Sequence, residues 1–233
     1  MIESHLTARQ LFAALCAGPQ RPRFGFGRRA ALVNVDPQRA YTDVAAFPAT
    51  AYETDPRQCE HINALASLCR EKGFPVIWTY VAYLEGGEDC GIWGTRTNTP
   101  DSLQNIHEGS ERAQLDPRLV IASTDIVIRK RMASAFFETN LRSLLTFHGV
   151  DTVVVTGGST SGCVRATVVE GLSCGHRMIV PEECVADRHE SPHFAGLYDM
   201  AVKYADVLPV VDVLKAFSAL PGRSPADGLA TIL

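Results

Sequence analysis

The stretch DTVVVTGGSTSGC at residues 151–163 decides the fold, because an uninterrupted apolar run passes directly into small residues and then into a cysteine. A strand without polar alternation is typical of a parallel sheet that is covered on both faces. We therefore expect residues 151–158 to form a buried strand. The residues that follow, 163–174, fit a helix that begins at the cysteine.

Similar apolar runs recur along the chain and alternate with helical patterns. The runs AALVNVD (30–36) and PVIWTYV (75–81) enclose a helix that starts at Asp55-Pro56 and stops at Lys72-Gly73. Further strands are expected at 125–130, 176–181 and 205–210, and further helices at 139–149, 191–204 and 211–219. This order predicts an α/β fold of three layers, α/β/α, with a central parallel six-stranded sheet and Rossmann-like winding.

The chain is long enough for one sizeable core, since 46% of its 233 residues are hydrophobic. Residues 1–24 predict an N-terminal arm and linker, which we expect to pack on a partner subunit of a homo-oligomer, a dimer or a tetramer. Residues 25–233 are then a single domain. Within it, residues 82–124 interrupt the alternation with a long loop rich in Gly, Thr, Asn and Asp, and such loops usually carry function.

Charge, hydropathy and cysteine spacing argue against several classes of protein. A formal charge of -4 without a basic stripe offers nothing to a phosphate backbone, so we expect no nucleic-acid partner. No apolar run approaches the roughly 20 residues that span a bilayer, and the start lacks a signal-peptide pattern, so we expect a cytoplasmic protein without a membrane partner. The seven cysteines contain no CxxC pair, which speaks against a disulfide framework or a structural zinc.

Cys163 is the strongest candidate for chemistry. A thiol at a helix N-terminus feels the positive end of the helix dipole and nearby N–H groups, which lower its pKa and can also hold an oxyanion. Asp36 and Lys130 end two other apolar runs, and a parallel sheet brings the ends of its strands to one edge. Singly, each residue has an ordinary interpretation, as a small core residue, a strand cap or a solvated flank. Their convergence on one edge favours a catalytic group.

Three segments carry a resemblance to a known family over residues 29–214. They are ALVNVDPQRAYTD (31–43) with Asp36, VIRKRMASAFFETNL (127–141) with Lys130, and the long run from 153 to 188 that contains Cys163. In this order and spacing they resemble the isochorismatase-like cysteine hydrolases, most closely the branch of N-carbamoylsarcosine amidase and maleamate amidase.

The resemblance implies a role for each residue of the triad. Asp36 is the general base that takes the thiol proton, Lys130 stabilises the charged pair, and Cys163 attacks the amide carbonyl. It also implies a cis peptide bond between Gly158 and Ser159, with the backbone N–H groups of Ser159 and Cys163 facing the oxyanion. The reaction implied is hydrolysis of a small carboxylate-bearing amide or N-carbamoyl compound, such as N-carbamoylsarcosine or maleamate, through a thioester with release of ammonia.

The substrate pocket is less well defined by the sequence. Arg188 matches in spacing an arginine that binds the substrate carboxylate in that branch, and a planar guanidinium suits a carboxylate. The alternative is a surface arginine paired with Asp187 or Glu190. Aromatic residues that could wall the pocket, or serve only local packing, are Tyr83, Trp93 and Phe136. A biuret or ureidoacrylate amidohydrolase is the closest rival activity.

Departures from relatives bear on cofactors and on other classes. The nicotinamidase branch binds a metal through histidines after the second strand. Here residues 78–94 contain no histidine, and the next one along the chain is His107, so we expect no metal and no cofactor. The turn TGGSTSG lacks both G-x-G-x-x-G and a P-loop lysine, which leaves a nucleotide-binding oxidoreductase as a weak alternative. A catalytically inactive scaffold is the other alternative, and the filled triad positions argue against it.

Overall fold

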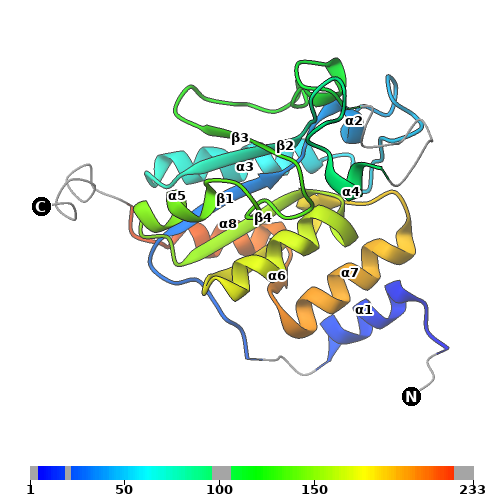
Figure 1. The fold of residues 1–233 in the computed structure, drawn as a ribbon. Coiled ribbons are helices and arrows are strands. Elements are labelled where there is room, and N and C mark those ends of the chain that lie inside the picture. Colours follow the sequence, from blue (N-terminus) through cyan, green and yellow to red (C-terminus); the bar gives the residue numbers. More distant parts are fainter. Residues whose placement is uncertain (1–4, 19–21, 96–105, 223–233) are drawn as a thin grey trace, which may run out of the picture.

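A parallel sheet forms the centre of the computed structural model, which describes residues 5–18, 22–95 and 106–222. Its strand order is β3-β2-β1-β4-β5-β7 (Figure 1), and every neighbouring pair along this order is parallel. These strands are β1 (Ala30–Val35), β2 (Val76–Val81), β3 (Ile126–Lys130), β4 (Thr152–Gly158), β5 (Arg177–Pro181) and β7 (Asp206–Leu208). The predicted parallel sheet and its six strands are confirmed.

A seventh strand, β6 (Val185–Ala186), was absent from the prediction. It pairs in parallel with the end of β4, where Val185 lies opposite Gly157 and Ala186 opposite Gly158. Two residues are too short to give a periodic signal, so no element was predicted between the strand at 176–181 and the helix at 191–204. The consequence is local, because β6 holds the residues after it beside the end of β4.

Helices cover both faces of the sheet (Figure 1), as predicted. One apolar cluster joins the sheet to α5 (Leu141–Phe147), α6 (Arg165–Ser173) and α7 (Glu190–Lys203), and another joins it to α3 (Gln58–Glu71) and α8 (Val210–Ser218). The shorter helices are α2 (Arg39–Thr42), α4 (Gly91–Gly94), η2 (Glu111–Ala113), η3 (Thr160–Val164) and η4 (Glu182–Cys184). Among the residues described, no helix is both long and apolar enough to cross a bilayer.

The N-terminal arm forms α1 (Ala8–Ala17), which begins with a capping box at Thr7. Its Phe12 ring is 4% exposed and lies 5.9 Å from the ring of Phe194 on α7. Arg9 pairs with Glu190 at 3.0 Å, and the two helices lie side by side in Figure 1. The arm therefore packs on α7 of its own chain through Phe12, and its packing on a partner subunit stays a prediction.

The described part of the loop at 82–124 packs on the end of β2. Buried residues there form a small apolar cluster with β2 and α2, which includes Val81, Tyr83, Cys90 and Ile106. Tyr83 pairs with His107 through an isolated bridge, and Gln38 pairs with Leu115 in the same way. Residues 96–105 of this loop lie outside the described residues.

Gly157 provides a test of the packing at the centre of the sheet. Its backbone is left-handed, with φ of +103°, and a Cβ there would overlap the backbone carbonyl of Val35 on β1. We expect Gly157→Ala to lower the free energy of unfolding by more than about 3 kcal/mol, because neither backbone segment has room to move. The measurement is equilibrium unfolding in urea.

Gly175→Ala is the matched control. Gly175 also has a left-handed backbone, with φ of +91°, but nothing lies within 4 Å of a Cβ added there. This variant should lose only about 1–2 kcal/mol, the cost of the backbone conformation itself. Equal losses in the two variants would contradict the close approach of β1 and β4 at Gly157.

Candidate active site

The carboxyl ends of the strands β1, β3 and β4 bring Asp36, Lys130 and Cys163 into contact. Lys130 Nζ lies 2.7 Å from Asp36 Oδ2 and donates to Cys163 Sγ at 3.3 Å. The ammonium also donates to the carbonyl of Met132 at 2.9 Å. The side chains of Asp36 and Lys130 are 0% exposed, and Cys163 is 8% exposed. The lysine therefore bridges a carboxylate and a thiol in an environment that is almost free of solvent.

Asp36 is fixed by the neighbouring strand β2. Its backbone is left-handed, with φ of 50°, and its N–H donates to the carbonyl of Thr79 at 3.1 Å. The Thr79 hydroxyl donates to Asp36 Oδ1 at 2.8 Å. Within the part of the chain that the structure describes, Oδ2 accepts no hydrogen bond beyond its ion-pair contact with Lys130. One carboxylate oxygen is thus held in place while the other retains a lone pair for a proton.

The nucleophile candidate lies in an irregular turn between β4 and α6. The bond between Gly158 and Ser159 is cis, at the position that the resemblance implies. Residues Thr160–Val164 then form a π-helical turn, in which Gly162 has φ of -107° and ψ of -106°. Regular α-helix starts only at Arg165, so Cys163 precedes the helix that was predicted to begin with it.

The turn leaves two backbone N–H groups for a ligand. The N–H groups of Gly162 and Val164 donate to the carbonyl of Ser159, and that of Ser161 donates to Asp187 Oδ2 at 2.8 Å. Among the described residues, the N–H of Ser159 meets no acceptor, and that of Cys163 meets none outside its own turn. These are the two groups predicted to face an oxyanion.

The chain is similar to known proteins over most of its length. Residues 30–212 match the family model described as the isochorismatase domain. The chain belongs to the isochorismatase family. It is 37% identical to the maleamate amidohydrolase of Pseudomonas putida, covering 86% of this chain and 92% of the relative, and 35% identical to the N-carbamoylsarcosine amidase of an Arthrobacter species, covering 85% and 75%.

A solved structure has the same fold. The cysteine hydrolase of Pseudomonas syringae superposes with a TM-score of 0.78 at 20% identity, covering 86% of this chain and 99% of that one. The family match supports a hydrolase and gives no support to the alternative of a nucleotide-binding oxidoreductase.

Burial sets the charge state of this isochorismatase-family triad. It raises the pKa of the Cys163 thiol to about 12, although Lys130 acts in the opposite direction. This reverses the lowered pKa expected from a cysteine at a helix start, because the irregular turn lies in the core. For Lys130, burial lowers the pKa but Asp36 and Cys163 raise it further, with a net increase. The resting site therefore contains an ammonium beside a neutral thiol.

Two tyrosines near the thiol were missed by the sequence analysis. The rings of Tyr41 and Tyr52 stack at 6.1 Å. Burial raises the pKa of both hydroxyls well above the usual range, and the negative charge that Cys163 carries when it ionises raises them further. The Tyr52 hydroxyl would overlap a Cβ added at Gly158, so it lies against the cis peptide. Tyr41 follows Asp36 by five residues in the first family motif, a signal that could have found it; Tyr52 has no such signal.

The aromatic residues predicted as pocket walls differ in position. The Trp93 ring centre lies 6.0 Å from Lys130 Nζ, and buried Tyr83 donates its hydroxyl to the carbonyl of Arg131 at 2.8 Å. Both lie beside the strand end that holds the lysine. Phe136 packs instead in the core beside α6, where it stacks on His176 at 6.1 Å. The structure therefore gives Phe136 a packing role.

Arg188 follows β6 and is exposed. Its backbone N–H donates to Asp187 Oδ1, and its guanidinium donates to the carbonyl of Ala49. It lines a surface pocket of about 200 Å³. The other lining residues come from α1, the loop before α3, the segment between β6 and α7, and α7: Arg9, Glu53, Thr54, Asp187, His189, Glu190, His193 and Phe194. No residue of the triad lines this pocket.

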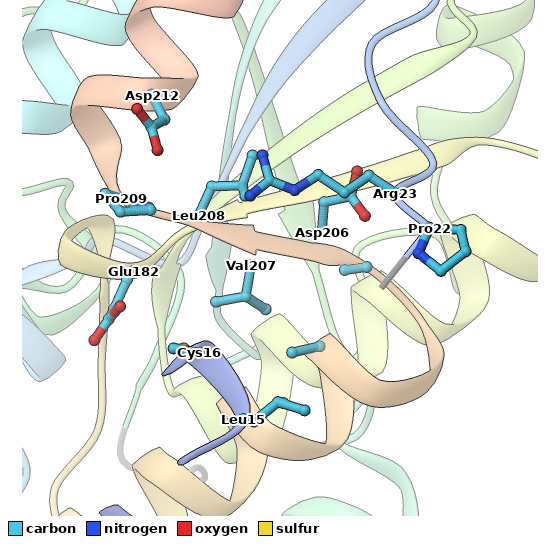
Figure 2. A pocket seen from close by; sticks show the side chains of 12 residues that line it. Leu15, Cys16, Pro22, Arg23, Glu182, Asp206, Val207, Leu208, Pro209 and Asp212 are labelled. Carbon is cyan, nitrogen blue, oxygen red and sulfur yellow. The ribbon is translucent and has the colours of Figure 1, made fainter. Parts of the chain in front are cut away.

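Another pocket, of about 330 Å³, lies beside the edge strand β7. Figure 2 shows Arg23, Cys16 and the acids Glu182, Asp206 and Asp212 around it. It too contains no residue of the triad. Within residues 5–18, 22–95 and 106–222, no group of three or more His, Cys, Asp and Glu side chains is placed to hold a metal ion.

The raised pKa of Cys163 can be tested by alkylation. A thiol whose pKa is raised stays neutral to higher pH, and only the thiolate reacts with iodoacetamide. The alkylation rate of Cys163 should therefore rise about tenfold per pH unit from pH 7 to 10 without a plateau. Mass spectrometry of the Cys163 peptide separates it from the other six free cysteines.

The variant Asp36→Asn should lower the pKa of the Cys163 thiol. Asp36 raises the pKa of Cys163 whereas Lys130 lowers it, so removing the carboxylate should make Cys163 more reactive at pH 7. A wild-type rate that levels off below pH 9 would show that the thiol is already ionised at rest. A slower rate in Asp36→Asn would show that the carboxylate assists deprotonation of the thiol more than it raises its pKa.

Proposed function

We propose that this protein is a cysteine-dependent amidohydrolase that cleaves a small carboxylate-bearing amide or N-carbamoyl compound through a thioester and releases ammonia. The observation that carries the proposal is the placement of Lys130 between Asp36 Oδ2 and Cys163 Sγ, at 2.7 and 3.3 Å, with a lone pair left on Oδ2. The names of two relatives, a maleamate amidohydrolase and an N-carbamoylsarcosine amidase, support this choice of substrate class.

In the first step Cys163 Sγ attacks the carbonyl carbon while its proton moves to Asp36 Oδ2. A neutral thiol needs this base, because burial disfavours a free thiolate. Lys130 keeps its proton and balances the negative charge that passes from the carboxylate to the reacting centre. The N–H groups of Ser159 and Cys163 stabilise the oxyanion, since they have no competing acceptor outside the turn.

In the second step the tetrahedral intermediate collapses and the C–N bond breaks. The leaving nitrogen takes the proton from the carboxylic acid of Asp36, so ammonia departs and a thioester remains. Water then attacks this carbon while Asp36 accepts its proton, and the C–S bond breaks as that proton returns to Cys163. An amide substrate gives a carboxylate, whereas a ureido substrate gives a carbamate that loses carbon dioxide.

Arg188 is our candidate for the group that binds the substrate carboxylate. Strand β6 holds Arg188 near the cis peptide, because Ala186, two residues before Arg188, pairs with Gly158. Its guanidinium donates to the carbonyl of Ala49, an acceptor that a carboxylate would outcompete through charge. A biuret or ureidoacrylate substrate is the rival within the same chemistry. An ammonia-release screen over carbamoyl amino acids, maleamate, ureidoacrylate, biuret and nicotinamide decides among them.

Cys163→Ala should abolish ammonia release from whichever substrate the screen identifies, because no other group can form the thioester. Cys174→Ala is the matched control, since Cys174 ends the helix that follows Cys163 and should be dispensable. Both variants should keep the melting temperature within a few degrees of wild type. Retention of more than about 1% of the activity by Cys163→Ala would refute the thiol mechanism.

Arg188→Ala should lower kcat/KM for carboxylate substrates by roughly 30- to 1000-fold, the equivalent of about 2–4 kcal/mol for a charge-assisted contact. A neutral amide of the same shape should lose little. Arg188→Lys should recover little, because an ammonium lacks the planar fork. Arg57→Ala is the control, since Arg57 is likewise an exposed arginine but pairs with Glu60 and lies outside this pocket. Equal losses on charged and neutral substrates would make Arg188 a structural residue.

A further inference from the structure

A buried hydrogen bond lies beneath the turn that carries Cys163. Thr160 Oγ1 and His193 Nδ1 are 2.8 Å apart, and their residues are 0% and 3% exposed. Thr160 is the first residue of η3, whereas His193 belongs to α7, 33 residues later. Neither side chain takes part in the proposed chemistry, so the pair needs another explanation.

Helix α7 also presses directly on this turn. A Cβ added at Gly196, one helical turn after His193, would lie 3.3 Å from Ser161 Cα and 3.5 Å from Thr160 Cγ2. A Cβ at this position would require the helix or the turn to shift by a few tenths of an ångström. The backbone of the turn is thus fixed by α7 on one side and by the bond from Ser161 N–H to Asp187 on another.

The His193 ring is itself held on its far side. The Phe194 ring meets it edge-on at 4.9 Å and an angle of 84°, and Phe12 of α1 packs against Phe194. Arg9 lies over the Phe194 ring at 4.7 Å. Burial, the largest effect on its pKa, lowers it, so the imidazole is neutral at neutral pH. The neutral imidazole of His193, packed against Phe194, can serve as a fixed hydrogen-bonding partner for Thr160.

We infer that His193 is a positioning residue: through its hydrogen bond with Thr160 it sets the orientation of residues 159–163, and with it the direction of the Ser159 and Cys163 N–H groups. The inference rests on the proposed function, in which those groups hold the oxyanion. Oxyanion donors must be placed within about 0.5 Å and 10–20° to be effective. His193 acts on the reaction through Thr160 and does not touch the reacting atoms.

Breaking the hydrogen bond from each side tests this role. His193→Phe keeps an aromatic ring without Nδ1, and Thr160→Val keeps the shape without the hydroxyl. Each should lower kcat roughly 10- to 100-fold, because the donors act on the transition state. KM should stay within about threefold in Thr160→Val, which is the decisive variant because His193 also lines the pocket that contains Arg188. The double variant should fall no further than the single variants, since both remove one interaction. His193→Asn, which retains a polar atom near Nδ1, should recover most of the activity.

Alkylation of Cys163 separates positioning from general damage to the site. It needs no oxyanion donor, so its rate at fixed pH should stay at the wild-type value in all these variants, and melting curves should confirm that they fold. Additive losses, a parallel fall in alkylation, or full activity in both His193→Phe and Thr160→Val would overturn the inference. A wild-type protein that releases no ammonia in the substrate screen would instead overturn the proposed function and this inference with it.

Discussion

The buried contact between Asp36 and Lys130 constrains much of the surrounding structure. Removing two charges from water costs several kcal/mol per ion, and close contact with full hydrogen bonding is needed to offset that cost. Here the hydroxyl of Thr79 and the carbonyl of Met132 complete the pair, which is 0% exposed. The partners come from the ends of β1, β2 and β3, so the charges are neutralised only when those strands lie in their observed register.

The sequence was sufficient to predict the sheet and the meeting of Asp36, Lys130 and Cys163 at one edge of it. Continuous apolar runs mark strands that are buried on both faces, and parallel strands bring their carboxyl ends to one edge. Asp36 and Lys130 end two of these runs, and Cys163 follows a third after a short turn. Residues whose positions depend only on strand direction were therefore predictable.

What the sequence missed depends on the path of the backbone between the strands. The π-helical turn at Thr160–Val164 has no periodic signature, and it moves Cys163 out of the helix whose dipole was expected to lower its pKa. Tyr52 reaches the cis peptide only through the course of the chain after α2. The N-terminal arm has an apolar face that includes Phe12. The sequence does not tell whether the surface against which this face packs, here α7, belongs to the same chain.

The packing of α1 on α7 also has a consequence for synthesis on the ribosome. The contact between Arg9 and Glu190 joins residues 181 positions apart. At a synthesis rate of about 5–20 residues per second, α1 leaves the ribosome roughly 10–40 s before α7 does. During that time the Phe12 side chain is not covered by α7. Strand β1 likewise waits for β4, with which it pairs at the centre of the sheet. The nascent chain therefore exposes the apolar residues of α1 and β1 for much of translation, so aggregation during synthesis should begin at these two segments.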